Sequence, residues 1–176
     1  KDSTFQAIFL KELGLRVLVV TATTCDLSEL GRFNIENLKR LGFDTIEISP
    51  NKIVRKKINK LCLELIGDIS WPEHLSIFTF PIHVACKFNI PIICWGENPQ
   101  SEYGGPVRKS GYELDRDWLE EFGGLLGLRI EDLQNHGDFN ENDLAFYKYP
   151  EIEIIKKLKI QGIFLGFTYI FSKKSK

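Results

Sequence analysis

The sequence contains no methionine among its 176 residues, and it begins at Lys1. Because natural chains normally start with methionine, we expect residues to precede Lys1, so that positions 1–176 form one domain truncated at its N-terminus. The sequence also lacks any apolar run as long as the roughly 20 residues of a membrane-spanning helix. No membrane partner is therefore predicted.

Neither sign of charge is in excess. The chain has 23 Lys and Arg residues against 24 Asp and Glu residues, which gives a formal net charge of −1. Nucleic acids and anionic membranes attract strongly basic surfaces, so this balance argues against either as a partner. The 43% of hydrophobic and 27% of charged residues are typical of a globular domain with a packed core.

Cysteine is scarce and widely spaced. The four cysteines are Cys25, Cys62, Cys86 and Cys94, and no two of them form a Cys-x-x-Cys pair. A zinc site within the chain is therefore not expected. The last three lie in apolar surroundings and are predicted to be reduced core residues. Reduced cysteines favour a cytoplasmic location.

The Walker-type pattern Gly-x-x-x-x-Gly-Lys-Ser/Thr and the dinucleotide pattern Gly-x-Gly-x-x-Gly are both absent. Short apolar strands instead alternate with helical periods. We expect the segments Leu15–Val20, Thr45–Ser49 and Ile92–Trp95 to form a parallel sheet, with the first fully buried and with 162–171 as a last strand. This order predicts an α/β fold, a three-layer sandwich built on a mostly parallel sheet.

The helices are predicted from the spacing of apolar residues. Ser3 to Gln6 matches a capping box that starts the first helix, and Gly14 ends it. Trp71 to Phe80 is predicted to be irregular or a short helix, and Pro81 is placed at the start of the next helix, which runs to about Phe88. Further helices are predicted at 27–41, 52–66 (with Val54, Ile58, Leu61, Cys62 and Leu65 inward), 112–126, 130–135 and 150–158, and an acidic loop is predicted at 138–143.

The most informative stretch follows the strand at Ile92. Trp95 is succeeded by Gly96, Glu97 and Asn98, with Glu102 and Tyr103 close behind. Ligands of open α/β sheets bind just beyond the carboxyl ends of the strands. Carboxylates, an amide and a phenol at such a position indicate a binding or catalytic loop. An ordinary surface loop of Gly, Asn, Pro and Ser is the alternative interpretation.

The start of the chain is the second candidate. Lys1-Asp2-Ser3-Thr4 opens a predicted helix, whose first N–H groups and dipole favour an anion. Helix capping alone would also explain these residues. A third polar segment, Thr21-Ala22-Thr23, follows the first predicted strand at its carboxyl end.

Two further features leave their interpretation open. Asn34 falls on the apolar stripe that contains Leu27, Leu30, Leu38 and Leu41, with Asn37 one step away, and it either binds a ligand or bonds a nearby loop. Basic residues crowd the early turns of the 52–66 helix, and they form either a solvated face or a site for phosphate or an acidic sugar. These are Lys52, Arg55, Lys56, Lys57 and Lys60.

These residues together carry a resemblance to a known family. Lys1-Asp2-Ser3-Thr4 resembles the tail of the Ser-Gly-Gly-x-Asp-Ser signature of the PP-loop ATP pyrophosphatases. The chain more narrowly resembles the N-acetyl sugar amidotransferases of surface-polysaccharide (lipopolysaccharide) biosynthesis. The resemblance rests on Gly31-x-x-Asn34-x-x-Asn37-Leu38, Pro50-Asn51 with Arg55-Lys56, the Gly96–Gly104 block and Gly162–Gly166. The two signature glycines, the strand before them and the family's cysteine-rich segment are not in this sequence.

The resemblance implies an adenine nucleotide alpha hydrolase-like, Rossmann-like fold and an ATP-dependent amidotransferase. Such an enzyme adenylates the acetamido oxygen of an N-acetyl sugar, and ammonia from a separate glutaminase subunit then displaces AMP to leave an acetamidine. Mg²⁺ is expected to offset the phosphate charge.

The implied site residues fall into three groups. Asp2 and Glu97 are the expected catalytic and metal-binding residues. ATP and pyrophosphate would contact Lys1, Asp2, Ser3, Thr4, Thr21, Ala22, Thr23 and Gly96. The sugar would contact Asn34, Asn37, Arg55, Glu97, Asn98, Glu102 and Tyr103. Two alternatives remain: another PP-loop enzyme of the tRNA-modifying or NAD-synthesising type, and a non-catalytic nucleotide-binding module of the same fold.

Overall fold

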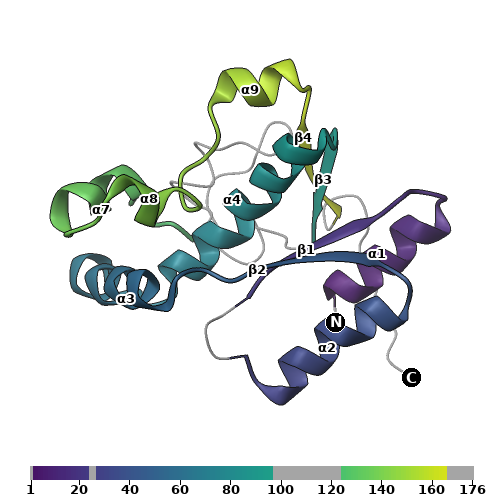
Figure 1. Cartoon of the computed structure of the whole chain (residues 1–176), viewed down its shortest axis with the longest axis horizontal. Helices are drawn as coiled ribbons and strands as arrows, with labels where there is room; N and C mark the ends of the chain where they lie inside the picture. The colour runs from purple at the N-terminus through teal and green to yellow at the C-terminus, as the bar shows by residue number, and fades with distance from the viewer. Residues whose placement is uncertain (1, 24–26, 97–123, 166–176) are drawn as a thin grey trace.

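The computed structural model describes residues 2–23, 27–96 and 124–165 (Figure 1). Its helices are α1 (Asp2–Glu12), α2 (Glu29–Arg40), α3 (Lys52–Ile66), α4 (Trp71–Phe88), α7 (Ile130–His136), α8 (Glu141–Leu144) and α9 (Ile152–Lys157). Its strands are β1 (Leu18–Ala22), β2 (Asp44–Ile48), β3 (Ile92–Trp95) and β4 (Gln161–Phe164). The chain is therefore a mixed α/β structure, and within the described ranges no helix is long and apolar enough to cross a bilayer.

The first two strands pair in parallel, as predicted. Their register runs from Leu18 opposite Asp44 to Ala22 opposite Ile48. The prediction placed the first strand too early, because Leu15 lies outside β1 with 52% of its surface exposed. Every residue of β1 is only partly buried, so the prediction of a fully buried strand was wrong.

The third strand does not extend this sheet in the part of the chain that the structure describes. Instead β3 pairs in parallel with β4, from Ile92 opposite Gln161 to Trp95 opposite Phe164. The prediction of one sheet from the first three strands was therefore not met. The apolar pattern of a segment predicts that it forms a strand, but it does not predict which other strand it will pair with.

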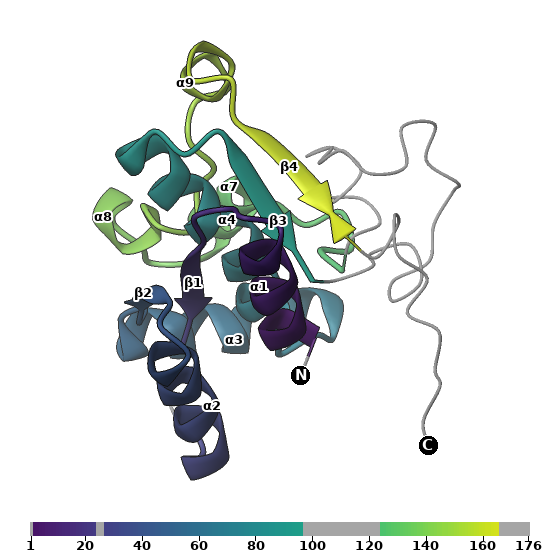
Figure 2. The same cartoon turned by 90° about the vertical axis from the view of Figure 1, so that its right-hand side faces the viewer.

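Helices cover both sides of β1 and β2. Ala7 of α1 and Leu38 of α2 form one apolar cluster with Phe43, against which Val19 packs. On the other side α4 contacts both β1 and β3, and these three elements meet near the centre of the molecule (Figures 1 and 2). A second cluster gathers α4, β3 and β4 around Phe78, Ile82, Ile93, Trp95 and Phe164. The core is thus organised around α4.

α4 is a single 18-residue helix, so the prediction that a new helix starts at Pro81 was wrong. Pro81 lies inside the helix and has no N–H to donate to the carbonyl of Ile77, four residues earlier. The indole Nε1 of Trp95 donates to that carbonyl at 2.8 Å. A distant side chain thus satisfies the acceptor that proline leaves, which a local pattern does not reveal.

Two other local predictions failed for related reasons. α1 begins at Asp2, ahead of the predicted cap at Ser3, and the side chain of Gln6 bonds elsewhere. The predicted acidic loop contains α8, whose capping box joins Asn140 and Asp143 by hydrogen bonds of 3.0 and 3.1 Å. Short polar residues that favour a loop are the same ones that cap a helix.

Apolar stripes proved narrower than predicted. α3 has the predicted bounds, with Asn51 as its N-cap, and Ile58 and Cys62 are fully buried. Leu65 was predicted to point inward but is exposed. In α2 the buried residues are Ile35 and Leu38, while Leu30 is 69% exposed. Helical spacing gives the centre of a buried stripe but not its width.

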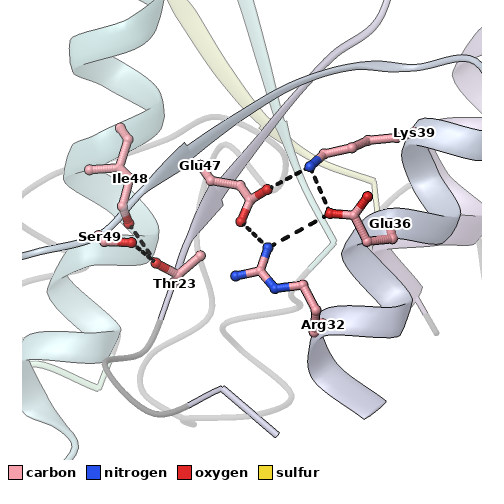
Figure 3. Close-up of polar contacts among 7 residues, drawn as sticks. All are labelled: Thr23, Arg32, Glu36, Lys39, Glu47, Ile48 and Ser49. Carbon is pink, nitrogen blue, oxygen red and sulfur yellow. Dashed lines mark hydrogen bonds and ion pairs between the residues drawn. The ribbon is translucent and has the colours of Figure 1, made fainter. Parts of the chain in front are cut away.

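Charged side chains of α2 are joined to β2 by a network of ion pairs (Figure 3). Glu47 of β2 accepts hydrogen bonds from Arg32 at 2.6 Å and from Lys39 at 2.9 Å. Lys39 also donates to Glu36 at 2.8 Å. The hydrogen bonds from Lys39 and Arg32 lower the pKa of Glu47, and those to Glu36 and Glu47 raise the pKa of Lys39. The network therefore favours the charged form of both groups.

We expect the contribution of Glu47 to stability to depend on pH. Because its pKa is lower in the folded state, this contribution is present above the ordinary carboxyl value of 4.5 and is lost as the pH falls through the folded-state value. Glu47→Gln should lower the urea midpoint at pH 7, and the difference from wild type should vanish in acid. The exposed Glu12→Gln is the control. An equal loss at both pH values would contradict the expectation.

Candidate functional site

The structure brings the two predicted anchors together. Ser3, in the first turn of α1, lies beside Gly96 at the carboxyl end of β3. A Cβ built on Gly96 would lie 3.6 Å from the backbone nitrogen of Ser3 and 3.7 Å from its Oγ. Ser3 is exposed and Thr4 is partly buried. Segments more than ninety positions apart in the sequence therefore meet at one point.

A residue that the sequence analysis did not assign to the site lies between these anchors. Gln6 of α1 is only 6% exposed, and its Nε2 donates to Sγ of Cys94 at 3.0 Å. Its Oε1 would lie 3.1 Å from a Cβ on Gly96. The signal available in the sequence was its position three residues after Ser3, which was interpreted as a capping box.

The carboxyl ends of β1 and β2 are tied together by Thr23. Its backbone N–H and its hydroxyl both donate to the carbonyl of Ile48, at 2.9 and 3.2 Å, and its hydroxyl lies 2.5 Å from that of Ser49 (Figure 3). Thr23 is buried, whereas Thr21 and Ala22 belong to β1. The predicted loop thus begins two residues later than expected.

Arg55 links three elements at the same end of the sheet. Its side chain, which α3 carries, is buried and forms an ion pair with Glu73 of α4. Its Nη1 also approaches the carbonyl oxygen of Thr23, at 3.5 Å. The predicted sugar-binding role of Arg55 remains a prediction, but its guanidinium already has protein contacts. Arg55 therefore supports the end of β1.

Neither protein-family models nor curated proteins match this chain. The interpretation of the site therefore depends on the residues of the chain and on their geometry.

Asn34 does not lie where the sequence analysis placed it. Asn34 is exposed, so it does not share the buried stripe of α2, and Asn37 is partly buried. The error came from counting Leu30 and Leu41 as buried, whereas both are exposed. The argument for ligand binding at Asn34 assumed a buried amide that needs a partner, and it does not apply to an exposed side chain.

Several predicted site residues fall outside the described part of the chain. These are Lys1, Glu97, Asn98, Glu102 and Tyr103, and the side chain of Asp2 is also outside it. Among the described residues no group of three or more His, Cys, Asp or Glu side chains could hold a metal ion. The expected roles of Asp2 and Glu97 remain predictions.

Among the described residues Cys62, Cys86 and Cys94 form no disulfide, and Cys86 and Cys94 are only partly buried, so the prediction that all three are core residues holds for Cys62 alone. Cys62 is fully buried, and this burial, together with the charge of Asp68, raises its pKa to about 12. Burial also raises the pKa of Cys86. Because the thiolate is the nucleophilic form, neither residue is activated for covalent catalysis at neutral pH.

Proposed function

We propose that this protein is an ATP-dependent amidotransferase that converts the acetamido group of an N-acetyl sugar into an acetamidino group. The observation that carries the proposal is the approach of Ser3, in the first turn of α1, to Gly96 at the end of β3. The segment that resembles the phosphate-binding motif thus meets Gly96, the first residue of the Gly-Glu-Asn motif. Glu97 follows Gly96 directly in the chain.

The first turn of α1 is suited to the phosphates of ATP. The first N–H groups of a helix have no partner within the helix, and the helix dipole places partial positive charge there. The backbone N–H groups of Ser3 and Thr4 would donate hydrogen bonds to the departing pyrophosphate. Gly96 carries no side chain, so its backbone can lie close to the first turn of α1.

The chemistry calls for such a site because an acetamido carbonyl is a poor electrophile and its oxygen is a poor leaving group. In the proposed reaction the acetamido oxygen attacks the α-phosphorus of ATP, and pyrophosphate leaves. Ammonia then attacks the imidate carbon, and AMP departs with the oxygen. Glu97 would take a proton from the attacking ammonia. No step needs a protein nucleophile, which agrees with the unactivated thiols of Cys62 and Cys86.

The remaining parts of the proposal concern the ligands. Bound Mg²⁺ would offset the phosphate charge, and the carboxylates of Asp2 and Glu97 offer the oxygen ligands that it prefers. Asn98, Glu102 and Tyr103 would bind the sugar, and Asn34, Asn37 and Arg55 are further candidates. A separate glutaminase subunit would supply ammonia, in the cytoplasm.

We also propose the Rossmann-like, three-layer arrangement as the fold. Two observations support it: both strand pairs are parallel, and helices lie on both sides of β1 and β2.

The test is an assay of the full-length protein with ATP, ammonia and a panel of nucleotide-linked N-acetyl sugars. AMP should form only when a sugar substrate is present. Asp2→Ala should slow AMP formation roughly ten- to a hundredfold, which corresponds to the loss of about 1.5–3 kcal/mol from one charge-assisted hydrogen bond. Glu97→Gln, which keeps size but removes charge, should reduce turnover at least as much.

The matched control is Glu131→Gln, which removes a carboxylate from the first turn of α7 and should leave turnover unchanged. Ser3→Ala removes a hydroxyl but keeps the backbone N–H, so its effect should be smaller than that of Asp2→Ala. Binding of ATP without AMP formation would instead indicate a non-catalytic nucleotide-binding module. Unchanged ATP turnover in both the Asp2 and the Glu97 variant would overturn the proposed site.

A further inference from the structure

The side chain of Gln6 connects the first turns of α1 to the end of β3. We propose that Gln6 is a positioning residue, which fixes Gly96 at the end of β3 relative to the N–H groups of Ser3 and Thr4. This inference rests on the proposed function. It concerns a residue that touches neither ATP nor sugar in the scheme above and acts through β3.

The contacts of Gln6 fall on one face of β3. Alternate residues of a strand point to the same side, so Cys94 and Gly96 share a face, and Ile93 and Trp95 share the other. Gln6 donates to Sγ of Cys94 at 3.0 Å and places Oε1 against Gly96. Ile93 and Trp95 pack instead into the cluster that contains Phe78 of α4. The end of β3 is therefore held from α1 on one face and from α4 on the other.

A simple packing role does not account for the choice of residue. Burying an amide without hydrogen bonds is costly, so an apolar side chain would fill the same space more cheaply. A glutamine offers a donor and an acceptor at the end of one side chain. Here the donor bonds Sγ of Cys94, and the amide oxygen lies beside Gly96, 3.1 Å from where a Cβ would be. Any alanine at position 96 would press on this amide, so the glycine and the glutamine fit each other.

The consequence for catalysis follows from the sequence, because Glu97 comes directly after Gly96 and a shift of Gly96 would move the point from which the proposed catalytic residue extends. A displacement of about 1 Å in a reacting group can reduce a rate by about a hundredfold. The N–H groups of Ser3 and Thr4 belong to the backbone of α1, and they persist when the side chain of Gln6 is changed. Loss of Gln6 should therefore affect turnover much more than ATP affinity.

The kinetic test is Gln6→Met in the full-length protein, since methionine keeps the length but not the hydrogen bonds. We expect kcat per folded molecule to fall at least about tenfold, while KM for ATP changes by less than about threefold. The control is Ser76→Ala, which removes an equally buried polar group whose hydrogen bond to Pro72 stays within α4. This variant should keep its full kcat per folded molecule.

A second measurement does not depend on activity. Gln6→Ala should speed alkylation of Cys94, detected by mass spectrometry of the labelled peptide, whereas Ser76→Ala should not. Unchanged labelling, or full kcat in an active Gln6→Met variant, would overturn the positioning role while leaving the proposed function in place. A wild-type protein that forms no AMP with any sugar would overturn the proposed function and, with it, the catalytic role of Gln6, whatever the labelling shows.

Discussion

Replacement of Trp95 by alanine is expected to lower the free energy of unfolding by about 3–5 kcal/mol. Trp95 is buried at the end of β3, with its ring centroid 6.1 Å from that of Phe78 and 5.6 Å from that of Phe164. Its removal would leave a large cavity between α4, β3 and β4. Urea denaturation followed by far-UV circular dichroism measures the loss.

The hydrogen bond of Trp95 can be separated from its packing. Trp95→Phe keeps an aromatic ring but leaves the carbonyl of Ile77 without a donor, which should cost about 1–3 kcal/mol in addition to the lost area. In a Pro81→Ala background residue 81 regains an N–H, and the helix itself can supply the bond to Ile77. The cost of Trp95→Phe should then shrink by about 1 kcal/mol.

The double-mutant cycle formed by Trp95→Phe and Pro81→Ala can also contradict this explanation. Strictly additive costs of Trp95→Phe and Pro81→Ala would show that the indole does not replace the missing N–H of proline. A matched control is Trp71→Phe, because Trp71 is equally buried and its indole donates to the carbonyl of Leu125 at 2.9 Å. Its cost should be independent of residue 81.

The second large effect is expected at Arg55. Arg55→Met removes the charge that pairs with Glu73 and the donor that faces Thr23. Breaking a buried ion pair typically costs about 3–5 kcal/mol, because the remaining charge loses its partner. Glu73 keeps 27% of its side-chain surface exposed, so we expect a value near the lower limit, about 3 kcal/mol, by urea denaturation.

The partner variant distinguishes lost pairing from lost packing. Arg55→Met combined with Glu73→Met replaces both charges by apolar groups and should recover part of the stability. Lys56→Met, an exposed basic residue on the same helix, should have little effect. If the double variant were as unstable as the sum of its parts, the ion pair would not be the source of the loss.

Sequence reasoning succeeded where short-range chemistry decides the structure. The bounds of α3 follow from Asn51 as N-cap and Gly67 as the left-handed C-cap, and the four apolar residues 92–95 gave β3 its limits. The parallel pairing of β1 and β2 followed from the helix between them. These features depend on neighbours within a few positions or on a single crossover.

Sequence reasoning failed where a residue far away in the chain determines the local structure. Pro81 was expected to start a helix but lies inside α4, and the donor that replaces its N–H comes from the distant Trp95. Gln6 was interpreted as part of a cap, because its partner Cys94 is 88 positions away. The choice of β4 as the neighbour of β3 likewise has no local signal. The sequence singled out Ser3 and Gly96, which lie side by side, but not the side chain of Gln6 beside them.

The pairing of β3 with β4 also bears on the order in which the protein can assemble during synthesis. Leu18 pairs with Asp44, 26 positions later, whereas Ile92 pairs with Gln161, 69 positions later. Closing the longer loop costs about 0.9 kcal/mol more in chain entropy. During synthesis β3 cannot pair until β4 has emerged from the ribosome. The strand end that carries Gly96 is therefore completed late, after the β1–β2 unit has formed.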